Sequence, residues 1–240
     1  MITIAADAAS DRCTIAATDG TRVVHRDLDG ARGHAGRILA LLDETLRDLD
    51  AVPRDIGQLL TGDGPGSFTG LRVVAALAKA LAWRRQLPWS TAPSLRIRAA
   101  AHRPAAGGRV LALSDALRGE LYAGCWEFAD DAVSQVGPSP RAVDPAGLVS
   151  VFGAVDVVVG SIPATALDVV SQVTGRVPVT GSAALPDARR LFELHAMRGG
   201  TVPVIDAAQW EPEYGRPAEA QAVWERKHGR PLPPASGVAS

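Results

Sequence analysis

Apolar and polar positions in the first thirty residues follow the pattern of short strands. Two apolar runs, "MITIAAD" and "RCTIAAT", are joined at "AASD", and Asp19-Gly20 follows the second run. Short apolar runs separated by turn residues are typical of a β-hairpin. A third strand is expected at "TRVVHRDL".

The next segments change to the spacing of helices. In "HAGRILALLDETLRDLD" the apolar residues recur every three or four positions, with charges opposite: Ala35, Ile38, Leu39, Leu42, Leu46 and Leu49. Such spacing predicts an amphipathic helix. A short strand "IGQLLTGD", a helix "TGLRVVAALAKALAWRRQ", a strand "LPWSTAPSL" and a helix "SLRIRAAAH" follow. Strands that alternate with helices predict an α/β fold with a mixed sheet.

The second half repeats the beginning of the chain. "VLALSDALRGELYAG" places strand, aspartate, turn and strand in the order of "ITIAADAASDRCTIA", so that Asp115 corresponds to Asp7. Because the match is one of pattern and a single aspartate, coincidence stays an alternative. Duplicated lobes of this kind occur in the actin, sugar-kinase and Hsp70 type of fold. A strand is expected at 157–161, and helices are expected at 163–173, 184–198 and 217–228.

We therefore predict a two-lobed α/β fold with duplicated mixed-sheet lobes. A turn-rich hinge, "RPAAGG", separates an N-terminal lobe at 1–104 from a smaller C-terminal lobe at 105–228. The last helix of the second lobe would pack back on the first. Residues 229–240 are rich in Pro, Gly, Ser and Ala and are expected to be a disordered tail.

Composition narrows the functional classes. The chain has 240 residues, 47% of them apolar, and a net charge of −1, so no global basic field would hold RNA or an anionic membrane. No apolar run approaches the roughly 20 residues of a membrane span, and the N-terminus lacks the features of a signal peptide. Cys13 and Cys125 are expected to be reduced core thiols. A cytoplasmic location follows from these features.

The most unusual stretch is "TGDGPGSFTGLR", residues 61–72. Glycines before a helix can form an anion site, but a Walker A loop would need a lysine that is missing here, and the dinucleotide fingerprint lacks its third glycine. The alternative is a tight strand-to-helix turn, with Phe68 in the core and Ser67 or Thr69 as the N-cap. The candidate loop residues are Gly64, Pro65, Gly66, Ser67, Thr69 and Gly70.

This loop also carries a family resemblance. "GPGSFTGLR" followed by "AKALA", "SDALRGELYAG" and "EPEYGRPAEA" resembles the TsaB (YeaZ) family over roughly residues 1–225. Members of that family help to make the threonylcarbamoyl modification of the adenosine beside the tRNA anticodon, and they have the two-lobed actin-like fold. The resemblance therefore implies the fold that the repeat predicts.

The resemblance also implies partners. Family members pair helices equivalent to 34–50 and 69–85 with TsaD, a catalytic relative, and sometimes with a second copy of themselves; TsaE, an ATPase, joins the assembly. Leu41 lies away from the main apolar stripe of the first helix, and the second helix is rich in alanine. The implied interface residues are Ile38, Leu41, Leu42, Thr45, Leu49, Arg72, Val73, Ala76, Leu77 and Ala80. Contact with tRNA would occur only through the complex, and no membrane contact is expected.

We expect no catalysis by the chain itself. TsaD binds a metal ion through two histidines, and Ser94 and Arg98 stand where those histidines would fall. Asp7 and Asp115 are each followed by segments without the glycine that an actin-type phosphate loop needs. No metal, no cofactor and no catalytic residue is therefore expected. The rival hypothesis is a small-molecule kinase or ATPase on the same fold, and a third is an autonomous tRNA-binding protein.

Overall fold

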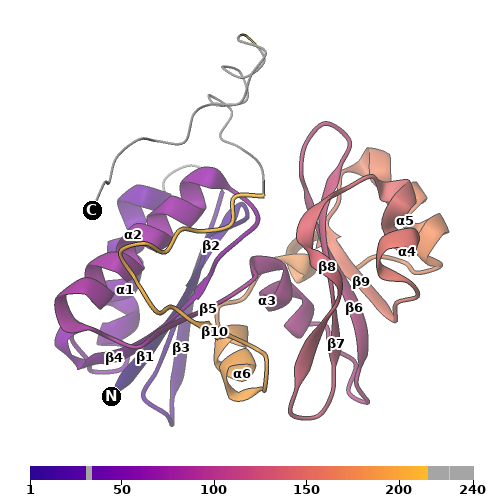
Figure 1. Ribbon diagram of the computed structural model, residues 1–240. Helices are drawn as coiled ribbons and strands as arrows, with labels where there is room; N and C mark the ends of the chain where they lie inside the picture. Colours follow the sequence, from indigo (N-terminus) through magenta and orange to yellow (C-terminus); the bar gives the residue numbers. More distant parts are fainter. Residues whose placement is uncertain (31–33, 216–226, 228–240) are drawn as a thin grey trace.

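The computed structural model describes residues 1–30, 34–215 and 227. Its strands form a six-stranded sheet in the order β10-β5-β4-β1-β2-β3 and a four-stranded sheet in the order β8-β7-β6-β9 (Figure 1). The first sheet consists of β1 (Ile2–Asp7), β2 (Arg12–Thr18), β3 (Val23–Asp29), β4 (Ile56–Gly62), β5 (Trp89–Ala92) and β10 (Val202–Pro203). The second consists of β6 (Gly108–Asp115), β7 (Leu121–Phe128), β8 (Val133–Val143) and β9 (Val157–Ser161).

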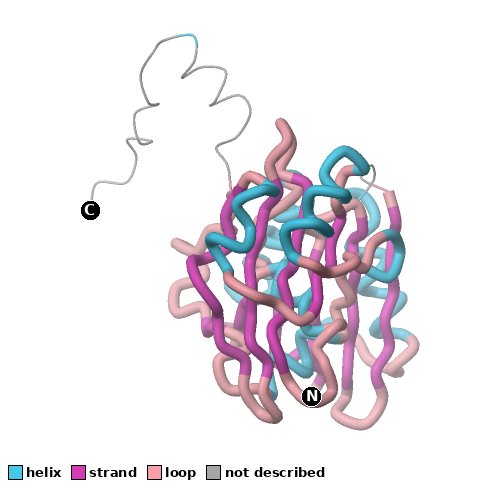
Figure 2. Tube along the Cα trace, turned by 90° about the vertical axis from the view of Figure 1, so that its right-hand side faces the viewer, coloured by secondary structure: helices cyan, strands magenta, loops and turns pink. Residues whose placement is uncertain are grey.

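Helices cover the outer faces of both sheets and separate the inner ones. The α-helices are α1 (His34–Arg47), α2 (Phe68–Arg85), α3 (Ser94–Ala100), α4 (Leu148–Phe152), α5 (Ala164–Thr174) and α6 (Arg190–Ala196). Helices α1 and α2 lie on the outer face of the first sheet, α4 and α5 lie on that of the second, and α3 lies between the sheets (Figure 1). In the view turned by 90°, strands run side by side from top to bottom (Figure 2).

The two sheets repeat one topology. Strand β1 pairs antiparallel with β2 and parallel with β4, and β6 pairs antiparallel with β7 and parallel with β9. Asp7 and Asp115 are the last residues of β1 and β6. The predicted duplication and the two-lobed α/β fold are therefore confirmed.

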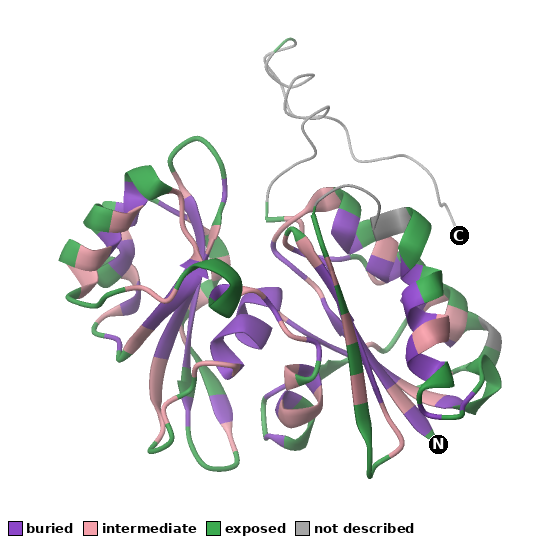
Figure 3. Ribbon diagram, turned by 180° about the vertical axis from the view of Figure 1, so that it is seen from behind, coloured by how far each residue is buried: buried purple, intermediate pink, exposed green. Residues whose placement is uncertain are grey.

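The core has three parts. One lies between the first sheet and helices α1 and α2, and another lies beneath α4 and α5. The third surrounds α3, where Leu95 and Ile97 belong to one cluster with Trp126 and other residues of the second lobe. All residues of α3 are buried, which Figure 3 shows as a purple helix at the junction. The core therefore continues from one lobe to the other through α3.

Some boundaries differ from the prediction. Helix α1 ends at Arg47, because the chain turns over the next three residues and Asp50 has a positive φ of 53°. Strands β8 and β10 were not predicted: β8 is an edge strand that alternates partly buried and exposed residues, and β10 has two residues. Helix α6 begins at Arg190 because a 3₁₀ turn, Gly181–Ala184, precedes it.

Two predictions concern residues that are barely described. The expected last helix at 217–228 lies outside the described residues except for Lys227, and the tail at 229–240 lies wholly outside them. The division of the chain at 104/105 stays a prediction. In the described ranges, Cys13 and Cys125 are buried free thiols, and burial raises their pKa to about 12 and about 11.

Candidate functional site

The glycine loop packs tightly against the turn that follows β1. A Cβ atom on Gly66 would lie 2.0 Å from the carbonyl oxygen of Ala9, and one on Gly70 would lie 1.8 Å from that of Ala8. Gly64 has a φ of +105°, and its Cβ would lie 2.0 Å from the carbonyl oxygen of Glu213. These positions need glycine because another backbone approaches each of them closely.

Several N–H groups of the loop donate to other groups of the protein. The Ser67 N–H donates to the Ala9 carbonyl oxygen at 2.7 Å, and the Gly64 N–H donates to Ser94 Oγ at 3.0 Å. Ser67 is the N-cap of α2, and its Oγ accepts from the Gly70 N–H at 3.2 Å. Because a phosphate cradle needs N–H groups that point outward, the geometry favours a loop that sets the start of α2. Pro65 is buried, and Thr69 is exposed in the first turn.

The interface residues expected on α1 lie inside the chain. The five of them belong to its own core or pack beside it: Ile38, Leu41, Leu42, Thr45 and Leu49. The expected separate edge at Leu41 is wrong, because Leu41 faces inward while Leu39, placed in the main stripe from the sequence, is 65% exposed. Helix α1 therefore presents Leu39 to the outside, next to exposed Ala40.

The residues expected on α2 divide between two faces. Arg72, Ala76 and Ala80 are exposed, Val73 is half-buried and Leu77 is buried. We call the exposed set the outer face of α2, defined by Thr69, Arg72, Ala76, Ala80 and Trp83. Trp83 is 74% exposed. Small residues on such a face allow another helix to approach closely.

Asp7 is part of a buried network at the lobe junction. Its carboxylate accepts from Ser94 Oγ at 2.5 Å and from the Ala9 N–H at 3.3 Å. Burial raises the pKa of Asp7, and the nearby Arg98 guanidinium opposes that shift. Arg98 is itself buried, which lowers its pKa to about 10, and it donates to the carbonyl oxygen of Leu113 on β6. The network therefore ties the first lobe to the second through α3.

A second charged pair joins Asp63 to Arg96, which lies two residues before Arg98 on α3. Burial raises the pKa of Asp63, which follows β4, to about 6, although the Arg96 guanidinium lowers it in part. Arg96 Nη1 donates to the carbonyl oxygens of Gly199 and Gly200 at 2.8 and 3.0 Å. These roles of Arg96 and Arg98 were not predicted, because two arginines in a short helix are typical of an exposed face.

The segment 201–215, which we call the strap, returns from the second lobe to the first. Trp210 packs on Trp89 of β5, with ring centroids 4.5 Å apart. Lys79 of α2 pairs with Glu211 at 2.9 Å between Nζ and Oε1. Among the described residues, the strap therefore lies along one side of α2, contacts its outer face at Arg72 and leaves Ala76, Ala80 and Trp83 exposed.

The strap ends in an aromatic stack at the start of α2. The rings of Tyr214 and Phe68 lie 4.7 Å apart, and the Arg72 guanidinium lies 4.1 Å from the Phe68 centroid. Arg72 Nε also donates to Tyr214 Oη at 3.3 Å. Phe68 is therefore half-buried in this stack. The interpretation of the loop as a tight turn had placed Phe68 in the core. The motif "EPEYG" contributed to the family resemblance, but nothing in its sequence predicted that Tyr214 would contact Phe68.

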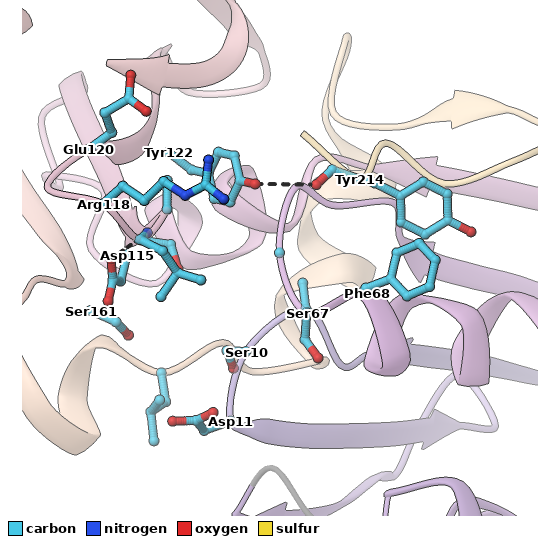
Figure 4. Close-up of a pocket in the computed structure, with 16 residues that line it drawn as sticks. Ser10, Asp11, Ser67, Phe68, Asp115, Arg118, Glu120, Tyr122, Ser161 and Tyr214 are labelled. Carbon is cyan, nitrogen blue, oxygen red and sulfur yellow. Dashed lines mark hydrogen bonds between the residues drawn. The ribbon is translucent and has the colours of Figure 1, made fainter. Parts of the chain in front are cut away.

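A cleft of about 710 Å³ lies between the lobes, beside this stack (Figure 4). Both aspartate turns, the glycine loop and the strap contribute to its walls. The lining residues with polar or aromatic side chains are Ser10, Asp11, Ser67, Phe68, Ser114, Asp115, Arg118, Glu120, Tyr122, Ser161 and Tyr214. Asp115 thus faces the cleft, whereas Asp7 does not line it.

Neither a metal cluster nor a membrane-spanning helix is present among the described residues. Over residues 1–30, 34–215 and 227, no group of three or more His, Cys, Asp or Glu side chains is placed to hold a metal ion. In the same ranges, no helix has the length and apolar character to cross a bilayer.

Comparisons with known proteins agree with this fold. A family model described as TsaD, tRNA N6-adenosine threonylcarbamoyltransferase, matches residues 27–138. The chain is 33% identical over 112 residues to the tRNA threonylcarbamoyladenosine biosynthesis protein TsaB of Bacillus subtilis, and 38% identical over 121 residues to that of Escherichia coli. These matches cover 47% and 50% of this chain and 48% and 52% of the relatives. The chain thus spans about half the length of the curated relatives it matches.

A solved structure extends the similarity to most of the chain. YeaZ from Pseudomonas aeruginosa is 27% identical, with a TM-score of 0.73, and the match covers 89% of this chain and 99% of that one. The chain is thus similar to TsaB over about half of its length and to YeaZ over most of it. The resemblance of the loop to TsaB is thereby confirmed, and the matched family model includes the whole loop and α2.

Proposed function

We propose that this chain is a non-catalytic subunit in the threonylcarbamoyl modification of the adenosine beside the tRNA anticodon. The observation that carries the proposal is the similarity to proteins named TsaB, together with a match to nearly the whole of a YeaZ structure. The kinase alternative is not favoured by these relatives. A cytoplasmic location is part of the proposal.

Its partner would be TsaD, and TsaE would join the assembly. We place the contact on the outer face of α2 together with Leu39 of α1, because exposed apolar and small side chains gather there. Large exposed apolar groups on a soluble protein are typical of interaction sites. A second copy of the chain would use the same face. Binding would stabilise the active conformation of TsaD by mass action.

The lack of a catalytic role is supported by two features of the aspartate turns. Asp7 is occupied by Ser94 and Ala9 and faces Arg98, so it is not placed to hold a metal-bound phosphate. The Leu117 N–H, in the turn after Asp115, donates to Asp115 Oδ1 at 2.7 Å. The Asp7 carboxylate and the Leu117 N–H, two groups that a phosphate site could use, are thus engaged within the chain.

Light scattering of the chain mixed with TsaD of the same cell tests the proposal. We expect a stable heterodimer with the wild type. Ala76→Arg should weaken it by about a hundredfold or more, because an arginine in the middle of the outer face prevents close helix packing. Ala164→Arg, at an exposed position on α5 of the other lobe, is the matched control and should bind normally.

Two outcomes would contradict the proposal. If the wild type does not bind TsaD, TsaD is not its partner. If Ala76→Arg and Ala164→Arg lose the same amount of TsaD affinity, the interface is not on the outer face of α2. ATP turnover by the isolated chain, lost on replacing Asp7, would restore the kinase hypothesis. Salt-dependent binding of tRNA by the chain alone would support direct RNA recognition instead.

A further inference from the structure

The cleft between the lobes has the size of a small-molecule site. Its volume of about 710 Å³ lies within the range of ligand pockets, roughly 300 to 1,000 Å³. Its walls come from both lobes and from the strap, so a ligand there would contact segments far apart in the sequence. The proposed partner surface on α2 leaves the purpose of this cavity unexplained.

The charges that line the cleft oppose a phosphate ligand. Among the described lining residues, Asp11 and Asp115 place two carboxylates on the wall of the cleft, against the one guanidinium of Arg118. A site with this excess of negative charge repels polyanions and attracts cations. Each lobe contributes a negative charge to the cleft, since Asp11 follows β1 of the first lobe and Asp115 ends β6 of the second.

Three N–H groups beside the cleft are used within the chain, whereas two carboxylates keep open acceptors. The N–H groups of Ala9, Ser67 and Leu117 donate to Asp7, Ala9 and Asp115. In contrast, the carboxylate of Asp11 and the second oxygen of Asp115 have no hydrogen-bond partner within the described part of the chain. An ionised carboxylate only accepts hydrogen bonds. The ligand group that complements these two carboxylates is therefore a donor.

The cleft is also polarised along its length. Figure 4 shows Arg118 extending toward Tyr122 and the backbone of Tyr214, away from Asp11. Tyr122 Oη donates to the Tyr214 carbonyl oxygen at 3.4 Å, so the aromatic end is joined to the strap. An amine therefore fits the end with Asp11 and Asp115, and an aromatic or apolar body fits the space between this end and the tyrosines.

We propose that this cleft binds a nucleoside-sized organic cation, with its amine between Asp11 and Asp115. The site is distinct from the proposed partner surface, and it needs no TsaD. Failure of this proposal would therefore leave the proposed function untouched, and failure of TsaD binding would leave the cleft proposal untouched.

A matched series of ligands tests the charge requirement on the isolated full chain. Calorimetry would compare 5′-amino-5′-deoxyadenosine with AMP, which carries a phosphate at the same position, and would include tryptamine as an amine without a sugar. We expect the amines to bind at least about tenfold more tightly than AMP, since each amine meets two carboxylates where AMP is repelled.

Paired variants locate the binding. Asp11→Asn/Asp115→Asn keeps the shape of the cleft, and the Asn oxygen still accepts from the Leu117 N–H, so we expect a folded protein that has lost the preference for amines. Asp130→Asn/Asp168→Asn changes the net charge equally at exposed positions outside the cleft, and should keep it. Circular dichroism checks the fold of each variant.

Three results would overturn the proposal. Binding of AMP as tight as that of both amines, or tighter, would refute the role of the two carboxylates. A preference for amines that persists in the Asp11/Asp115 variant, or that is lost in the control pair, would show that the binding is not in the cleft.

Discussion

The two lobes repeat one strand order but carry helices of different length. Helices α1 and α4 each connect the third strand of a lobe to its fourth, and they have 14 and 5 residues. Helices α2 and α5 follow the fourth strand and have 18 and 11 residues. Short helices are enough to cover the second sheet, so the longer pair in the first lobe offers surface beyond that need. The difference between the copies supports a partner surface on α1 and α2.

The two corresponding aspartates have also diverged. Asp7 is fully buried and braces α3, whereas Asp115 is exposed and lines the cleft. The pairing registers Ala6 with Thr61 and Ser114 with Ser161 place Asp63 and Pro163 in corresponding positions after β4 and β9. The buried charges of the first lobe therefore have no copies at these positions of the second, and the duplicated turns serve different purposes.

The largest expected effect separates the inner and outer faces of the long helices. Leu42→Glu places a charge in the core, where Leu42 is 5% exposed, and should lower the free energy of unfolding by about 4 kcal/mol. Ala76→Arg on the outer face of α2 should change it by no more than about 0.5 kcal/mol. Urea unfolding measures both. Similar losses in the two variants would mean that α2 has no free face.

Substitutions of Asp7 and Asp115 should differ almost as much in their effect on the free energy of unfolding. Asp7→Asn leaves the Arg98 charge buried without its carboxylate, so we expect a loss of about 3 kcal/mol in the free energy of unfolding. Asp115→Asn should cost about 0.5 kcal/mol or less, because Asp115 is exposed. Chemical unfolding of both variants provides the comparison.

A double variant is the control for the Asp7 network. Asp7→Asn/Arg98→Met removes both charges and should recover part of the loss, since the uncompensated guanidinium is then gone. If the double variant loses the sum of the two single effects, Asp7 and Arg98 are not coupled.

The smallest effect concerns the pH dependence that Asp63 gives the first lobe. Its pKa is raised to about 6 in the folded chain, so the folded state binds a proton more readily than the unfolded one. Its stabilising contribution is present below about pH 4 and is lost as the pH rises through about 6. Relative to the wild type, the free energy of unfolding of Asp63→Asn should therefore increase by about 2 kcal/mol between pH 4 and pH 7.

Urea unfolding of the two proteins at matched pH values measures this difference. Asp168→Asn, an exposed change in the second lobe, is the control and should follow the wild type throughout. A constant difference between wild type and Asp63→Asn across this range would show that Asp63 titrates normally in the folded chain.

Much of the fold could be predicted because it follows from local patterns. The apolar runs of β1 and β2, the periodicity of α1 and the order of strand, aspartate, turn and strand around Asp115 each depend on residues close in sequence. The glycine loop was also recognisable, although its glycines serve the close approach of Ala8 and Ala9, which lie far away along the chain.

The rest depended on contacts that periodicity does not contain. The sequence placed Leu39 in the apolar stripe and Leu41 away from it, whereas packing in the core of the first lobe buries Leu41 and leaves Leu39 exposed. The arginines of α3 are buried only because two lobes meet around a short helix. Tyr214 reaches Phe68 because the strap returns across the molecule, a path that no local signal predicts.

Reconstitution of the modification tests the central claim most directly. TsaD of the same cell would be supplied with threonylcarbamoyl-adenylate and tRNA, with or without this chain, and the modified adenosine would be measured. We predict modification that depends on the chain, is lost with Ala76→Arg and persists with Ala164→Arg. Equal modification in the absence of the chain would contradict the account.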